Sequence, residues 1–418
     1  MASTEADVFD RLGRGFRALG AWIDDRFPMT KLIKEHATEY YASKNFNFWY
    51  GFGVIATVVL VMQLVTGIFL TMNYKPSSAE AFASVEYIMR DVEWGWLIRY
   101  LHSTGASAFF IVVYLHMFRG LLYGSYKKPR ELVWIIGMFI YLCLMAEAFF
   151  GYLLPWGNMS YWGAQVIVSL FGAIPWIGNG LSEWIRGDFY ISDITLNRFF
   201  AFHVIAVPLA LVGLVVVHIM ALHEVGSNNP DGIEIKENKN KDGKPIDGVA
   251  FHPYHTSKDL VIVIVFFILF SAVVFFAPDM GGYFLEHANF QPADPLQTPP
   301  HIAPVWYFTP FYAMLRAVPD KLLGVVFMGS AVLLPFFLPW LDRCRVKSIR
   351  YRGWMYKVSL MVFAATFLTL GYLGLQQPTP PVVVLCRIFT ILYFAFFFLM
   401  PFYSRAEKTK PVPTRVTP

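Results

Sequence analysis

Stretches of nearly continuous apolar residues alternate with polar segments along the whole chain. Eight of them are found, near 50–72, 101–122, 133–153, 199–222, 260–277, 322–341, 354–375 and 382–403. Each has about twenty residues, the length that a helix rising about 1.5 Å per residue needs to cross ~30 Å of hydrocarbon. The pattern predicts an all-α membrane protein with eight transmembrane helices.

The polar segments also contain candidate elements. Aromatic and small residues within the loop at 154–198 predict short helices resting on the membrane surface. Val8 to Phe27 has an apolar face opposite its arginines, as expected for a helix at the membrane interface, although a soluble amphipathic helix has the same pattern. That apolar face consists of Val8, Phe9, Leu12, Phe16, Leu19 and Ile23. Segment 228–248 is predicted to be a hydrophilic loop.

Lysine and arginine indicate how the spans are oriented, because short loops rich in them stay in the cytoplasm. The termini and alternate loops carry 25 of these residues, against seven in the intervening loops and their flanks. Both termini are therefore expected inside. The predicted organisation is a cytoplasmic interfacial segment at 1–49, a four-helix bundle at 50–222, a cytoplasmic loop at 223–259, four further spans at 260–403 with an outer loop at 278–320, and a cytoplasmic tail at 404–418.

Composition agrees with a protein that dissolves in lipid. Hydrophobic residues make up 56% of the 418 and charged residues only 15%, whereas soluble proteins average about 25% charged. The net charge of +5 follows the membrane topology, so no nucleic-acid partner is expected. Cys143, Cys344 and Cys386 lie too far apart in the sequence to suggest a disulfide framework or a zinc site. No secretory signal peptide is apparent in the first 45 residues.

Two of the predicted spans carry a pair of histidines each. The second has His102 and His116, and the fourth, which runs in the same direction, has His203 and His218. Fourteen residues of helix end roughly 40° short of four full turns, so His102 and His116 share one face about 21 Å apart. Facing histidines at two depths can supply both axial ligands of two haem irons. With both axial positions filled, the expected chemistry is electron transfer.

Two glycines on each of the first and third spans are fourteen residues apart, the same spacing as between His102 and His116. They are Gly53 and Gly67 on the first span and Gly137 and Gly151 on the third. Glycine in membrane helices often marks close helix packing, but this spacing also suits two flat macrocycles lying against bare backbone. Arg99 and Arg119, each three residues outside a histidine of the second span, are candidates to pair with haem propionates; an interfacial anchor is the alternative.

The fourth span poses a geometrical problem, because its histidines are fifteen residues apart. The extra residue adds about 100° of rotation around the helix, so His218 lies roughly 60° beyond four full turns from His203 instead of 40° short of them. Pro208 removes a backbone hydrogen bond in the middle of the span. We therefore predict a widened turn between Val204 and Leu211 that absorbs the surplus residue.

Several longer motifs occur along the chain. They are Leu97-Ile-Arg-Tyr-Leu-His-Ser-Thr-Gly-Ala-Ser107, Gly151-Tyr-Leu-Leu-Pro-Trp-Gly157, Arg198-Phe-Phe-Ala-Phe-His203, Leu222-His-Glu-Val-Gly-Ser-Asn-Asn-Pro230, Phe251-His-Pro-Tyr-His-Thr-Ser-Lys-Asp259 and the stretch from Thr298-Pro-Pro-His-Ile302 onward. From about residue 28 to the final span, the chain resembles cytochrome b, the quinol-handling subunit of the cytochrome bc complex. The resemblance implies two non-covalently bound b haems, with Arg198 among the residues around them.

The resemblance also implies two quinone sites. Quinone reduction on the inner side is expected at the ends of the fourth and fifth spans, where groups must relay two protons. Quinol oxidation is expected on the outer side, where one electron goes to a mobile Rieske protein and the other to the outer haem. The inner residues are His223, Ser227, Lys258 and Asp259, and the outer ones Tyr152, Pro304, Trp306, Tyr307 and Tyr312.

The chain departs from its relatives at one outer position. Their motif usually reads Pro-Glu-Trp-Tyr, and its glutamate is thought to help take the quinol proton, whereas this chain has Val305. Valine cannot accept a proton. The expected substitutes are Glu286, His287, or a chain of ordered waters with Tyr152; Glu286 could equally be a solvated loop acid.

By the same resemblance, the expected partners are a Rieske iron-sulfur protein, a membrane-anchored cytochrome c-type subunit, quinol and quinone, the lipid bilayer, and a second copy in a dimeric complex. The expected location is a bacterial plasma membrane, with a mitochondrial membrane as the less favoured alternative. A transporter or channel is the alternative from another class, and the di-haem anchor of a dehydrogenase or hydrogenase is a second one. The continuous chain, with no cysteine in the matching region of the first span, disfavours the plastid type.

Overall fold

The computed structural model describes residues 2–417, without the side chains of 2–12, 32, 33, 36 and 37. In this part of the chain, eight helical segments are long and apolar enough to span a membrane, as the hydrophobic pattern predicted. They are Phe48–Thr71, Gly95–Tyr123, Glu131–Leu153, Asp193–Val225, Phe251–Phe276, Lys321–Leu341, Trp354–Leu375 and Pro380–Ala406.

The N-terminal half contains the first four spans and several shorter elements. In order these are α1 (Ala2–Arg26), α2 (Met29–Ile33), η1 (Lys34–Thr38), β1 (Tyr41–Ser43), η2 (Phe48–Gly51), α3 (Phe52–Thr71), α4 (Ala81–Arg90), α5 (Gly95–Tyr123), α6 (Glu131–Leu153), α7 (Asn158–Phe171), α8 (Gly178–Arg186), α9 (Asp193–Ala201), η3 (Phe202–Ala206) and α10 (Val207–Val225).

The C-terminal half contains the other four spans. Its elements are β2 (Gly248–Ala250), η4 (Phe251–His255), α11 (Thr256–Phe276), η5 (Met280–Gly282), η6 (His287–Phe290), η7 (Trp306–Phe308), α12 (Thr309–Ala317), α13 (Lys321–Leu333), η8 (Leu334–Phe337), α14 (Leu338–Leu341), α15 (Trp354–Leu375) and α16 (Pro380–Ala406).

The spans form two packed groups. In the first, α3 packs against α5 and α6 against α10; in the second, α15 and α16 pack against each other and against the short helix α12, which also contacts α13. Buried side chains such as Phe110, Tyr141, Met314 and Phe397 form one hydrophobic core that runs through both groups. Many apolar side chains on the outer faces of the spans are exposed, for example Leu269 and Phe276 of α11. This distribution is expected where lipid is the solvent.

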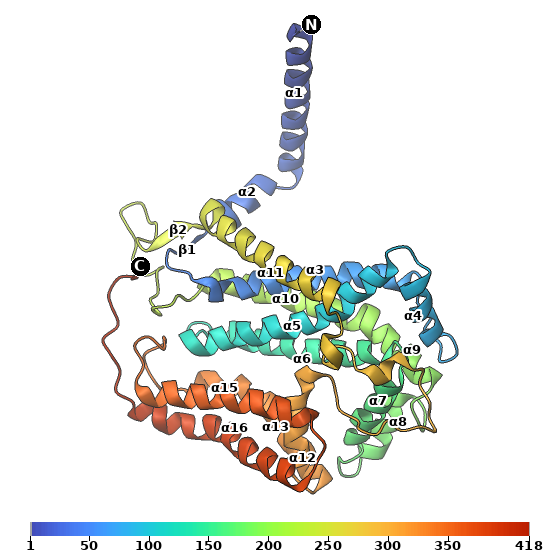
Figure 1. The fold of residues 1–418 in the computed structure, drawn as a ribbon. Coiled ribbons are helices and arrows are strands. Elements are labelled where there is room, and N and C mark those ends of the chain that lie inside the picture. Colours follow the sequence, from blue (N-terminus) through green and yellow to red (C-terminus); the bar gives the residue numbers. More distant parts are fainter. Residues whose placement is uncertain (1, 418) are drawn as a thin grey trace.

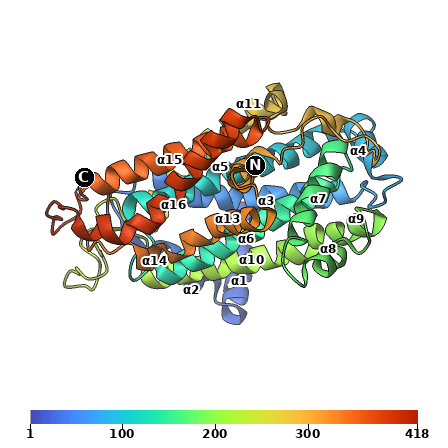
Figure 2. The same ribbon diagram turned by 90° about the horizontal axis from the view of Figure 1, so that it is seen from below.

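Different elements close the two ends of the bundle (Figures 1 and 2). Helices α4, α7, α8 and α9 lie at one end, so the surface helices predicted within 154–198 are confirmed as helices. At the other end β1 and β2 form a small antiparallel sheet in which Tyr41 pairs with Ala250. The sequence did not reveal this sheet, because three-residue strands are too short to show an alternating pattern.

The amphipathic segment at the N-terminus is helical, as predicted. Helix α1 stands away from the bundle in Figure 1, and Phe16 and Leu19 on its apolar face are exposed. The side chains of Val8, Phe9 and Leu12, which belong to the predicted apolar face, lie outside the described residues. Its position at a membrane interface stays a prediction.

The loops and tail around the start of α15 and the end of α16 are held by buried ion pairs. Arg352 and Asp342 are fully buried and paired at 2.5 Å, and Arg352 also contacts Glu407 at 2.6 Å. The tail beyond α16 continues this network, since Arg415 bonds Asp247 at 2.8 Å and Thr417 bonds Asp231. The predicted hydrophilic loop at 228–248 is therefore anchored through buried polar groups, among them Asn228, Asn229, Asp231 and Asp247.

The fourth span contains the widened turn that its histidine spacing predicted. Residues Phe202–Ala206 form a π-helical turn between α9 and α10, in which the backbone N–H of Val207 donates to the carbonyl of Phe202. The turn overlaps the predicted window but begins two residues before Val204. A single π turn takes up one residue beyond the α-helical repeat.

Candidate functional site

The four histidines and four glycines form two levels within the bundle. At one level, a Cβ on Gly67 would lie 3.3 Å from His102, and a Cβ on Gly151 would lie 2.3 Å from His203. At the other level, a Cβ on Gly53 would lie 3.3 Å from His116, and one on Gly137 would lie 3.2 Å from His218. Each glycine thus lets one imidazole lie against the backbone of the adjacent helix.

Within each level the two imidazoles face each other across the bundle. The ring centres of His102 and His203 are 6.0 Å apart, and those of His116 and His218 are 6.5 Å apart. Metal–nitrogen bonds of about 2.0–2.1 Å, with roughly 1.1 Å from nitrogen to ring centre, place the rings of a linear bis-imidazole site about 6.3 Å apart. The residues present therefore fit one metal-centred group at each level.

Hydrogen bonds fix the tautomers of the first histidine pair. The Nδ1 of His203 lies 3.0 Å from the carbonyl oxygen of Glu147, which can only accept. The Nδ1 of His102 lies 3.0 Å from the hydroxyl of Thr66, whose own proton is donated to the carbonyl of Met62. Both histidines consequently donate from Nδ1, which leaves the Nε2 lone pair available to a metal.

The three predicted haem-flanking arginines have different surroundings. Arg99 is partly buried one turn before His102. Arg119 donates to Ser125 at 3.0 Å, and its guanidinium lies 5.1 Å from the ring centre of Tyr50. Arg198 is exposed and donates to the carbonyl of Trp184 on α8. Arg99 and Arg119 are thus placed beside the two histidine levels, whereas Arg198 reaches toward the surface.

Near Gly151 a polar cluster joins α6 to the segment around η6, which lies between α11 and α12. The hydroxyl of Tyr152 donates to Glu286 Oε2 at 3.0 Å, and Asn289 donates to both of these groups at 3.0 and 3.2 Å. Burial raises the pKa of Glu286 to about 7. This is not the environment of a solvated loop acid. His287, by contrast, is 73% exposed and lies 3.8 Å from Asp279.

The Pro304-Val-Trp-Tyr307 segment is fixed against α5. The ring of Tyr307 stacks on Phe110 with centres 3.9 Å apart, and Trp306 Nε1 donates to Ser107 Oγ at 3.1 Å. Val305 is buried, and Tyr312 donates to the carbonyl of Ile302. The structure thus joins Tyr152 with Glu286 through one set of hydrogen bonds and anchors the motif through another.

At the other end of the bundle, His223 and Ser227 meet a residue that the sequence did not reveal. Tyr40 stacks on His223 with ring centres 4.5 Å apart and planes 9° apart. Tyr40 is also hydrogen-bonded to Ser227, and burial raises the Tyr40 pKa. Because Tyr40 precedes β1, the pairing of β1 with β2 helps to bring it to the end of α10. Only the folded sheet makes this proximity visible.

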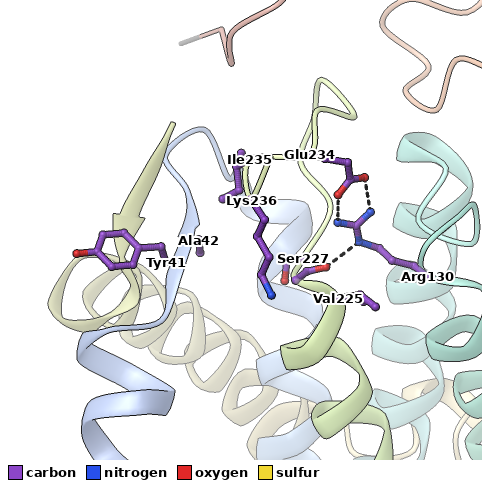
Figure 3. Close-up of a pocket in the computed structure, with 9 residues that line it drawn as sticks. Tyr41, Ala42, Arg130, Val225, Ser227, Glu234, Ile235 and Lys236 are labelled. Carbon is purple, nitrogen blue, oxygen red and sulfur yellow. Dashed lines mark hydrogen bonds and ion pairs between the residues drawn. The ribbon is translucent and has the colours of Figure 1, made fainter. Parts of the chain in front are cut away.

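Arg130 fixes the backbone next to Ser227 (Figure 3). Its Nε donates to the carbonyl of Gly226 at 2.7 Å, while its two terminal nitrogens bind Glu234 at 2.7 and 2.8 Å. Burial opposes ionisation of Glu234, but Arg130 and Lys347 hold its pKa below the ordinary value. A cavity of about 10 Å³ lies among these groups, which is about the space of one water molecule.

Lys258 and Asp259 lie on the first turns of α11. Lys258 is exposed, with its ammonium 4.5 Å from the ring centre of Tyr254. Asp259 is partly buried. Both are therefore on the helix that follows β2 and η4, rather than on the loop that holds Ser227.

Two family models match the chain over most of its length. Cytochrome b/b6/petB covers residues 37–226, and cytochrome b(C-terminal)/b6/petD covers 292–394. The chain belongs to the cytochrome b family. Family membership implies haem b binding, which agrees with the two histidine levels, and identifies an integral membrane protein of electron transfer.

Individual relatives agree along nearly the full chain. A cytochrome b of Allochromatium vinosum is 63% identical over 95% of this chain and 98% of its own length. A protein named cytochrome b/c1 from Bradyrhizobium diazoefficiens is 45% identical over 95% of this chain and 56% of its own length. Among solved structures, a chain of a hyperthermophilic respiratory Complex III matches with a TM-score of 0.86 and 40% identity, over 93% of this chain and 99% of that one.

Proposed function

We propose that this cytochrome b works in a respiratory complex of the Complex III type, where it oxidises quinol at an outer site, reduces quinone at an inner site, and contributes to proton translocation. The observation that carries the proposal is the pair of histidine levels. A transporter has no need of four histidines that face each other in two pairs, each against a glycine.

The ligands of the two haems are proposed to be His102 with His203 on the outer side, and His116 with His218 on the inner side. When bound, the haems carry electrons between the two membrane faces. The chain would hold them through Nε2 of each imidazole, and Gly53, Gly67, Gly137 and Gly151 leave room for these imidazoles against the adjacent helix. Arg99 and Arg119 are proposed to neutralise carboxylates at the edges of the macrocycles, with Arg198 as a further candidate.

On the outer side, Glu286 is proposed to take the quinol proton that Val305 cannot accept. A carboxyl with a pKa of about 7 is suited to accept a proton near neutral pH and release it again. Tyr152 and Asn289 orient it, while Pro304, Trp306, Tyr307 and Tyr312 shape the apolar wall. Quinol becomes quinone by losing two protons to the outer side and two electrons.

On the inner side, His223, Ser227, Lys258 and Asp259 are proposed to bind the quinone carbonyls and to relay two protons from the cytoplasm. Two observations support this assignment. Tyr40 connects His223 and Ser227, and Arg130 holds the backbone beside Ser227. Tyr40 therefore joins the proposed site as a residue that could pass a proton between the two.

The proposed partners are a Rieske iron-sulfur protein and a membrane-anchored cytochrome c-type subunit, in a dimeric complex in a bacterial plasma membrane. The relative named cytochrome b/c1 supports a cytochrome c-type partner. The proposed sidedness places both termini and the 223–259 loop in the cytoplasm, the interfacial segment at 1–49 against the inner surface, and the 278–320 loop outside.

A redox titration of the optical spectrum tests the proposal on the purified complex that contains this chain. Two b-type components with different potentials are expected. Replacing His203 by leucine should remove one component and replacing His218 the other. A wild-type complex with one haem or none would overturn the proposal.

A further inference from the structure

A carboxyl group lies beside one of the proposed haem ligands within the membrane. Glu147 is on α6, one turn before Gly151, and its Oε1 is 3.0 Å from the Nδ1 of His203. Both side chains are only 17% exposed. Acidic residues inside membrane spans are costly and commonly functional, and neither the predicted site nor the proposed function uses this one.

The carboxyl is not needed to fix the tautomer of His203. The backbone carbonyl of the same Glu147 already accepts from Nδ1 at 3.0 Å. The carboxyl oxygen Oε1 lies as close to Nδ1 as that carbonyl oxygen does, so it adds negative charge density beside Nδ1 rather than orientation. Its other oxygen, Oε2, is buried without a hydrogen-bond partner among the described residues, so the carboxyl is not held there by another side chain.

The four ligand histidines differ in this respect. The Nδ1 of His102 has the neutral hydroxyl of Thr66 as its partner. Among the ion pairs found in residues 2–417, none joins an acidic side chain to His116 or His218. The carboxyl thus distinguishes the outer level from the inner one.

We propose that the carboxyl of Glu147 acts electrostatically through His203 and so lowers the reduction potential of the outer haem relative to the inner haem. Negative charge close to Nδ1–H makes Nε2 a stronger electron donor to the metal. A stronger axial donor stabilises the oxidised iron and so lowers the potential. The inference rests on the proposed function, and it gives electron flow from the outer to the inner level a favourable direction.

The test measures the potentials of both haems in the intact complex with Glu147→Gln and Glu147→Leu. Each variant keeps the backbone acceptor of His203 and so retains the haem. For Glu147→Leu we expect at least a tenfold shift of the outer haem toward the reduced form, which is about 59 mV for one electron. Glu147→Gln should shift it in the same direction by less.

Two controls make the result specific. The inner haem in the same complex should keep its potential. Cys143→Ser changes a residue one turn away on α6 and should move neither haem.

An outer potential that stays at the wild-type value in both variants, with two haems present, overturns this inference but leaves the proposed function standing. Equal shifts of both haem potentials also overturn it, since they would indicate that the charge of Glu147 affects both haems alike and does not act through His203. If both variants lose the outer haem, Glu147 only maintains the fold, and the inference is wrong. A wild-type complex without two haems contradicts the proposed function itself.

Discussion

Replacing Glu286 by glutamine tests whether this buried acid takes the place of the missing motif glutamate. Its pKa of about 7 means that roughly a tenth of the molecules are ionised at pH 6, half at pH 7 and nine tenths at pH 8. If the carboxylate accepts the quinol proton, turnover should rise nearly tenfold per pH unit below pH 7 and level off above it. Removing such a base typically costs about 10²–10⁴-fold in rate.

The assay is steady-state quinol oxidation by the purified complex from pH 5.5 to 9, at saturating electron acceptor. Glu286→Gln should lower the rate and flatten its rise around pH 7. His287→Gln is the matched control, because that side chain is adjacent in sequence but 73% exposed, and it should behave as wild type. Wild-type turnover with an unchanged pH profile in Glu286→Gln would refute the assignment.

Thermal unfolding separates a lost base from a damaged fold. Because the folded-state pKa of Glu286 is raised from 4.5 to about 7, the wild type loses roughly 3 kcal/mol of stability as the pH rises between these values. Glutamine does not ionise and avoids this loss. The variant should therefore be at least as stable as wild type at pH 8, and a large destabilisation there would point to a structural role.

Two further substitutions and one deletion probe the fold. Gly151→Ala would place a Cβ 2.3 Å from His203, so the optical spectrum should show loss of the outer haem with the inner one retained. Deleting Ile205 from the π turn should restore the α-helical repeat and the fourteen-residue histidine spacing, so both haems should still bind; loss of either would argue against the role assigned to that turn. Arg352→Leu removes the buried ion pairs of Arg352 with Asp342 and Glu407 and leaves Lys127 as the ion-pair partner of Asp342, so it should lower the unfolding free energy by about 3–5 kcal/mol in thermal or denaturant unfolding.

Periodicity made the spans and the histidine levels predictable. A twenty-residue apolar run allows few alternatives in a membrane, and a polar side chain that recurs every fourteen residues marks one helical face. The widened turn in the fourth span could be predicted for the same reason, since one surplus residue has to be absorbed. Its position was two residues off because Pro208, which guided the prediction, lies beyond the turn rather than inside it.

Contacts between distant segments could not be read from periodicity. Tyr40 joins His223 and Ser227 through the β1–β2 sheet, and Asn289 joins Glu286 to Tyr152 across more than 130 residues. Glu147 is a single polar residue in an apolar span, without a partner at a regular spacing. The sequence alone does not distinguish it from a polar residue that the span merely tolerates. Its significance becomes visible only when the folded helices place it against His203.

The tail that follows α16 has a consequence for the order in which the chain matures during synthesis. Arg415 and Thr417 bind Asp247 and Asp231, which lie in the loop between the fourth and fifth spans. A ribosome completes that loop well before it reaches the tail. The loop that carries Ser227 therefore receives its last restraints only after the eighth helix has been made, so the proposed quinone-reduction site should be among the last parts of a newly made chain to reach its final structure.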